Sequence, residues 1–122
     1  MKQQAIFLPA GNICIMQTMQ SFRPDLDYYY KAIGCRTVDF VSAYALEGVE
    51  GLENIDLIVD DEGLFSEQPK VNIIASLLYG YKQHGQPIVG NALVVGIDPE
   101  TGETLPLTDE QINRLIEIIP TL

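Results

Sequence analysis

The spacing of apolar residues along the chain predicts alternating strands and helices. Short apolar runs bounded by Pro, Gly, Asn and charged residues are typical of strands. Five such runs occupy 4–9, 12–19, 37–44, 55–60 and 87–98. Helical spacing or capping residues mark three further segments, which are 22–33, 70–83 and 107–119.

These segments follow one another in the order ββαββαβα, which predicts the fold class. The first two strands flank Pro-Ala-Gly-Asn, a turn sequence that indicates a hairpin. No repeat, low-complexity stretch or long linker divides the chain. We therefore expect a single α+β domain over 1–122, with a mixed or mainly antiparallel sheet and helices packed on one side of it.

Capping residues indicate where the helices begin and end. Ser21 is a candidate N-cap and Gly34 a candidate left-handed C-cap for 22–33, although three consecutive tyrosines there also suit a strand. Thr108 is the expected N-cap of the last helix. The expected buried stripe of that helix is Ile112, Leu115, Ile116 and Ile119.

Composition narrows the class of protein. The chain has 122 residues and is 47% apolar, which is typical of one globular domain with its own core. No apolar run approaches the ~20 residues that a membrane span needs, and the apolar patch near the N-terminus is too short for a signal peptide. We expect a cytoplasmic protein with no membrane partner, in which Cys14 and Cys35 are buried thiols.

The charge is strongly acidic, at −10 with 17 acids against 7 bases. Such a surface repels nucleic-acid polymers, which are bound through clustered Lys and Arg. A small anionic ligand remains compatible with it, because a few cations suffice to hold one or two phosphates. Arg23, Arg36 and Arg114 are candidate phosphate ligands, and the alternative is that each is an ordinary surface residue.

No pattern in the chain predicts catalysis, a metal or a cofactor. His84 is the only histidine, and no GxSxG, Walker or GxGxxG motif occurs. The acids at 60–62 are consecutive, whereas oxygen ligands of a metal need spaced positions. We expect a protein that is not an enzyme.

The segment from 72 to 96 carries the candidate binding residues. Tyr79 and Tyr81 flank a glycine at the end of the predicted helix, and an aromatic ring at a pocket mouth can stack on a nucleobase. Asn91 interrupts an apolar strand, so its amide needs a partner. That partner is either local backbone at a bulge or the edge of a ligand. The remaining candidates in this segment are Lys82, His84 and Gly90.

The same segment, followed by Leu-Thr-Asp-Glu-Gln-Ile-Asn-Arg-Leu, resembles a family of short phage and mobile-element proteins of unknown function. Within it, the chain is most similar to phage Thoeris anti-defence proteins. The resemblance implies a sponge that binds a cyclic ADP-ribose isomer without cleaving it, in the cytoplasm of an infected bacterium, and so blocks TIR-dependent signalling. Some members also hold cyclic oligonucleotides at a separate site.

The resemblance also implies homo-oligomers, dimers or hexamers, with pockets at subunit interfaces. Tyr81 would take the stacking role and Asn91 the polar contact, while the family's phosphate-binding arginines have no clear match here.

Two other hypotheses remain open. The acids between Glu47 and Glu67 could bind a basic protein, which would make the chain an interaction or inhibitor protein with no small ligand. An enzyme acting on nucleotides would have to use His84 or the acids at 60–62.

Overall fold

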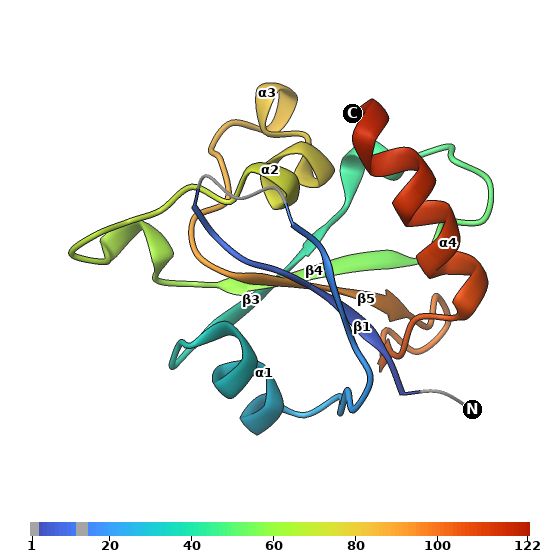
Figure 1. The fold of residues 1–122 in the computed structure, drawn as a ribbon, viewed down its shortest axis with the longest axis horizontal. Coiled ribbons are helices and arrows are strands. Elements are labelled where there is room, and N and C mark those ends of the chain that lie inside the picture. The colour runs from blue at the N-terminus through green and yellow to red at the C-terminus, as the bar shows by residue number, and fades with distance from the viewer. Residues whose placement is uncertain (1–2, 12–14) are drawn as a thin grey trace.

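The computed structural model describes residues 3–11 and 15–122 and shows one α+β domain around an antiparallel sheet (Figure 1). The strands are β1 Ala5–Leu8, β2 Gln17–Met19, β3 Val38–Ser42, β4 Ile55–Asp60, β5 Ala92–Ile97 and β6 Thr104–Leu105. The helices are α1 Leu26–Ile33, α2 Ile73–Tyr79, α3 Tyr81–His84 and α4 Asp109–Ile118. The predicted order ββαββαβα is confirmed, with a short helix α3 and a short strand β6 added to it.

The strands are hydrogen-bonded in the order β2-β1-β5-β4-β3, and every strand pair in the described residues is antiparallel. β5 is central, as its apolar sequence predicts. β4 is hydrogen-bonded along one edge of β5. The other edge is shared, because β1 pairs with 92–94 and β6 with 96–97.

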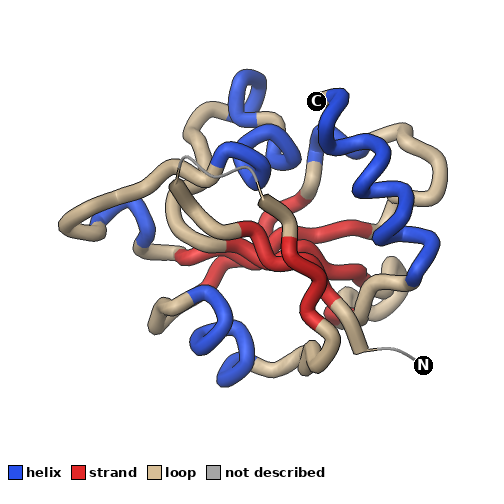
Figure 2. Tube along the Cα trace, in the orientation of Figure 1, coloured by secondary structure: helices blue, strands red, loops and turns tan. Residues whose placement is uncertain are grey.

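The helices pack on both faces of the sheet, so the expectation that they lie on one side is wrong (Figures 1 and 2). Leu93 and Val95 of β5 join Tyr29 and Ile33 of α1 in one buried cluster. Val94, the residue between them, joins the other and larger cluster, which is covered by α2 and α4. Successive side chains of a strand point to opposite faces of the sheet. Because every residue of β5 is apolar, the strand contributes side chains to the core on each face.

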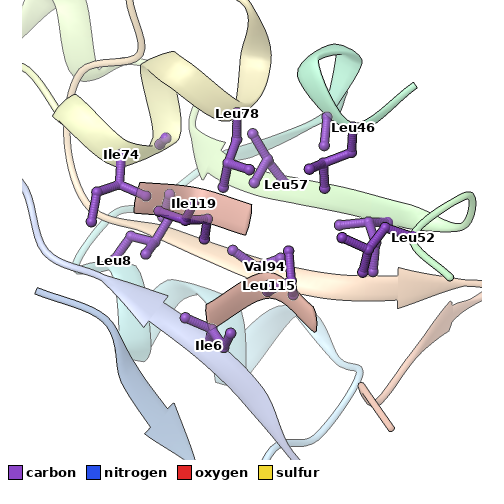
Figure 3. Close-up of a cluster of buried hydrophobic side chains, with 14 of the residues drawn as sticks. Ile6, Leu8, Leu46, Leu52, Leu57, Ile74, Leu78, Val94, Leu115 and Ile119 are labelled. Atoms are coloured by element: carbon purple, nitrogen blue, oxygen red, sulfur yellow. The ribbon is translucent and has the colours of Figure 1, made fainter. Parts of the chain in front are cut away.

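Figure 3 shows the larger cluster. Ile74 and Leu78 of α2 and Leu115 of α4 pack onto side chains of β1, β4 and β5. Ile112 and Ile119 are buried as predicted, but Ile116 is 49% exposed, which corrects the predicted stripe. The buried stripe of this helix and the 3₁₀ turn after it is therefore Ile112, Leu115 and Ile119.

Several boundaries differ from the predicted ones. α1 begins after Asp25, whose carboxylate accepts a hydrogen bond from the backbone N–H of Tyr28, so Ser21 is not its cap. The predicted helix over 70–83 is divided at Gly80, which adopts a left-handed conformation. The predicted strand over 87–98 begins only at Ala92. β2 is shorter than 12–19, of which 12–14 lie outside the described residues.

The predicted caps at Gly34 and Thr108 are confirmed. Gly34 has a φ of 77° and closes α1. The hydroxyl of Thr108 accepts from the N–H of Gln111, whose side chain accepts from the N–H of Thr108. Within 3–11 and 15–122, no helix combines the length and apolar composition needed to cross a membrane.

Candidate functional site

A cleft of about 330 Å³ opens where β3 and β4 meet the segment that joins α3 to β5. Val41 and Val59 form part of its wall, and Leu64 stands beside it on a 3₁₀ turn over Gly63–Phe65. The wall opposite the sheet consists of residues 84–89. Of the candidate residues from the sequence, Tyr79 and His84 line this cleft, whereas Arg114 lines a separate cleft of about 510 Å³ beside α4.

Three aromatic rings meet at one end of the cleft. The rings of Tyr44 and His84 are stacked, with centroids 4.0 Å apart and planes at 19°. The ring of Tyr79 lies 5.7 Å from Tyr44 and 6.0 Å from His84, tilted toward both. Tyr79 and His84 line the cleft, whereas Tyr44 is not part of its lining and is connected to it through its stack on His84.

Gly80 allows this arrangement. Its φ of 75° turns the chain sharply between α2 and α3, which brings His84 back over Tyr44. A Cβ at this position would lie 3.4 Å from His84 Cδ2 and 3.8 Å from Tyr44 Cβ. The glycine between Tyr79 and Tyr81 therefore positions the aromatic cluster.

Acidic side chains give the cleft its electrostatic character. Asp39, Asp60 and Asp61 line it, and within the described residues its lining has no Lys or Arg. Asp39 accepts from the N–H of Phe40 and Asp60 from the N–H of Glu62, both at 2.9 Å. These carboxylates favour ligand groups that donate hydrogen bonds and disfavour a phosphate inside the cleft.

Asn91 has two partners, and both are protein backbone. Its Oδ1 accepts from the N–H of Ala10 at 2.9 Å, and its Nδ2 donates to the carbonyl of Ile33 at 3.0 Å. The residue lies just before β5 and does not line the cleft. Its amide thus joins the turn after β1 to the end of α1, while the predicted ligand contact stays a prediction.

The other candidates are distributed around the cleft. Gly90 lies against Asp60, whose Cβ would be 3.3 Å from a Cβ at Gly90. Tyr81 and Lys82 begin α3 and are not part of the lining; Tyr81 is half-buried and Lys82 exposed.

Within one chain the three candidate arginines do not form a cluster, and each pairs with a different acid. Arg23 is paired with Asp25 at 3.3 Å and Arg114 with Glu117 at 3.2 Å. Arg36 makes a bidentate ion pair with Glu62, at 2.8 and 2.9 Å. Hydrogen bonding from Arg36, followed by that from Thr37, holds the pKa of Glu62 below its ordinary value.

Two buried polar residues that the sequence reasoning passed over hold the wall of the cleft. Asn72 caps α2 and donates from Nδ2 to the carbonyls of Leu8 and Gly90, both at 2.9 Å. Ser76 Oγ accepts from the N–H of Ile88 at 2.9 Å. An Asn directly before a helical apolar run is a recognisable N-cap signal, so Asn72 could have been found.

Tyr44 and Asp39 were also missed, and no local signal marks them. Tyr44 follows β3 in a 3₁₀ turn, and its role depends on a residue forty positions later in the chain, His84.

The prediction that Cys14 and Cys35 are buried thiols is tested only at Cys35. Cys35 is a free, half-buried thiol, and Cys14 lies outside the described residues. Burial, followed by the charge of Asp60, raises the pKa of Cys35, which makes it a poor nucleophile at neutral pH. No group of three His, Cys, Asp or Glu in the described part of the chain could hold a metal ion.

Comparison with known families matches residues 4–119 to a domain of unknown function, DUF3846. The chain belongs to this family. No curated protein and no solved structure matches it. The match covers nearly the whole chain, cleft and aromatic cluster included, so the site described above is a feature of this DUF3846 domain.

Proposed function

We propose that this DUF3846 protein captures a small nucleobase-containing signal and holds it without cleaving it, and that the signal is a cyclic ADP-ribose isomer. The observation that carries the proposal is the cleft of about 330 Å³ with aromatic rings gathered at its margin. Its volume is at the lower end of the range of small-molecule sites, and one base with its ribose is the part of the ligand assigned to it.

Each part of the cleft matches a part of such a ligand. The purine stacks on the rings of Tyr79 and His84 at the margin of the cleft, with Tyr44 supporting them from outside the lining, and the stacking contributes roughly 1–3 kcal/mol. The carboxylates of Asp39 and Asp61 accept hydrogen bonds from ribose hydroxyls and from N–H groups of the base.

The phosphates of the ligand lie outside the cleft in this proposal. The acidic lining repels them, and the nearest cation in sequence is Lys82, two residues before His84 on α3. A homo-oligomer, dimer or hexamer, with its sites at subunit interfaces supplies further cations from a second copy. The resemblance to Thoeris anti-defence proteins supports both the ligand and the assembly, and the cyclic oligonucleotides held by some of those proteins are a second ligand class to test.

The test is capture followed by mass spectrometry. Purified protein is incubated with lysate from cells whose TIR-domain enzyme is active, washed, heat-denatured, and its released ligand identified. Recovery of the intact cyclic isomer supports the proposal. A linear product makes the protein an enzyme, and an empty but folded protein refutes the proposal for this signal.

Variants identify where the ligand binds. His84→Ala and Tyr44→Ser each remove one ring of the stacked pair and are expected to weaken capture about tenfold or more. Phe65→Ser is the matched control, because Phe65 is exposed, aromatic and absent from the lining of the cleft. Loss of capture in Tyr81→Ser and Asn91→Ala, with His84→Ala unaffected, would move the site to the residues that the resemblance assigns.

A further inference from the structure

The loop between β4 and α2 presents an aromatic side chain to solvent. Phe65 is 84% exposed, the highest exposure of any large apolar residue in the described chain, and its neighbour Leu64 is 50% exposed. Val71 at the end of the loop and Ile73 in the first turn of α2 are 46% and 38% exposed. Figure 1 shows this loop projecting from the body of the domain.

The loop is held in a defined conformation at both ends. Its 3₁₀ turn is closed by a hydrogen bond of 2.9 Å from the N–H of Phe65 to the carbonyl of Glu62. Gly63 packs so tightly that a Cβ there would lie 2.3 Å from the carbonyl oxygen of Val89. Val71 pairs with the same Val89. The turn that carries Phe65 is therefore preorganised, which lowers the conformational entropy lost when a partner binds to it.

Acids flank the exposed ring. Between positions 60 and 70 there are four acids against one base, and Arg36 pairs with one of the acids, Glu62, which leaves a local charge of −2: Asp60, Asp61, Glu62, Glu67 and Lys70 with Arg36. This charge repels nucleic-acid phosphates and anionic lipid headgroups. A second copy of the chain carries the same acidic turn, so like charges disfavour contact of this surface with itself. A polypeptide that is both basic and apolar has the complementary character.

We propose that Phe65 and Leu64, on the acidic turn after β4, form a docking surface for a basic amphipathic segment of another protein. The apolar side chains of that segment cover the phenyl ring, and its Lys and Arg residues face the surrounding carboxylates. Phe65 does not line the cleft but Leu64 does, so this surface adjoins the small-molecule site proposed above and differs from it in the exposed phenyl ring.

The experiment uses a defined probe. A fluorescent peptide of about 18 residues is built from Leu and Lys with Leu at helical spacing, and a peptide of the same composition is scrambled. Fluorescence anisotropy measures binding of each to the full chain. We expect saturable binding of the amphipathic peptide, weakened by added salt, with the scrambled peptide binding at least about tenfold less tightly.

Variants then separate the ring from the general charge. Phe65→Ser should weaken binding about tenfold or more, and Phe65→Leu by less than about threefold. Ile116→Ser, at a 49%-exposed apolar position on α4, is the matched control and should leave binding unchanged. Far-ultraviolet circular dichroism checks that each variant is folded.

Three outcomes overturn the proposal. One is equal binding of the amphipathic and scrambled peptides, which would show that charge alone accounts for the binding. Another is equal effects of Phe65→Ser and Ile116→Ser. The last is a dimer in sedimentation of the peptide-free protein that the Phe65→Ser variant no longer forms. That result would place the phenyl ring in a contact between two copies of the chain. His84→Ala should leave peptide binding unchanged, so this proposal and the proposed ligand capture fail independently.

Discussion

Replacement of Asn72 by Ala should be among the most damaging single changes in this domain. The side chain is 1% exposed and makes three hydrogen bonds. Its Oδ1 accepts from the N–H of Ala75 at 3.0 Å, which caps α2. Its Nδ2 donates to carbonyls at the end of β1 and just before β5, so one amide joins a helix to two strands of the sheet.

The expected cost follows from these bonds. Loss of an N-cap destabilises by about 1 kcal/mol. A buried carbonyl that loses its donor costs about 1–3 kcal/mol, and here the carbonyl of Leu8 is buried while that of Gly90 is partly so. We expect Asn72→Ala to lower the free energy of unfolding by about 3 kcal/mol, a large part of the ~5–15 kcal/mol typical of a domain.

Urea denaturation followed by circular dichroism measures the loss. A change of about 3 kcal/mol lowers the urea midpoint by roughly 1–3 M, with an unchanged slope. Asn113→Ala, on the exposed face of α4, is the matched control and should stay within about 0.5 kcal/mol of the parent protein.

The Asn72→Asp variant tests whether the two hydrogen bonds donated by Nδ2 of Asn72 stabilise the domain. The aspartate keeps the cap, since it still accepts from the N–H of Ala75, but it cannot donate to the two carbonyls and turns a negative oxygen toward them. It should therefore destabilise at least as much as Asn72→Ala at neutral pH. If Asn72→Asp is as stable as the parent protein, the two donor bonds contribute nothing and the account of Asn72 is refuted.

Two further predictions concern the turn after β4, at Gly63 and at the ion pair between Glu62 and Arg36. Gly63→Ala should destabilise by about 1–3 kcal/mol in the same urea assay, because its Cβ would lie 2.3 Å from the carbonyl oxygen of Val89 and the backbone must shift; an unchanged midpoint would mean that the turn is loosely held. Arg36→Gln should raise the pKa of Glu62 toward its ordinary value, measured by carboxyl NMR titration. Because the folded pKa of Glu62 is lowered, the stability that the pair contributes is present above the unfolded pKa and is lost as the pH falls through the folded pKa. The stability difference between Arg36→Gln and the parent protein should therefore disappear in acid, and a difference independent of pH would argue against the ion pair.

Local sequence signals were sufficient for some elements and not for others. Thr108 and Gln111 identify the start of α4 because a capping box involves only residues three positions apart. Periodicity predicted one helix over 70–83, but the left-handed conformation of Gly80 ends α2 and begins α3, which periodicity alone does not indicate. The strand predicted over 87–98 begins too early, because the apolar residues Ile88 and Val89 are buried in the wall of the cleft and not in β5.

By itself, then, the sequence determined the order of the elements, the central place of β5, and the caps at Gly34 and Thr108. These depend on residues close together in the chain. The tertiary structure decided that α1 covers the opposite face from α2 and α4, since β5 is apolar toward both sides and its pattern favours neither. It also decided that Asn91 bonds to backbone 81 and 58 positions away, and that Tyr44 stacks on His84 beside three aspartates. Such contacts arise only when distant segments pack together, and one-dimensional spacing carries no information about them.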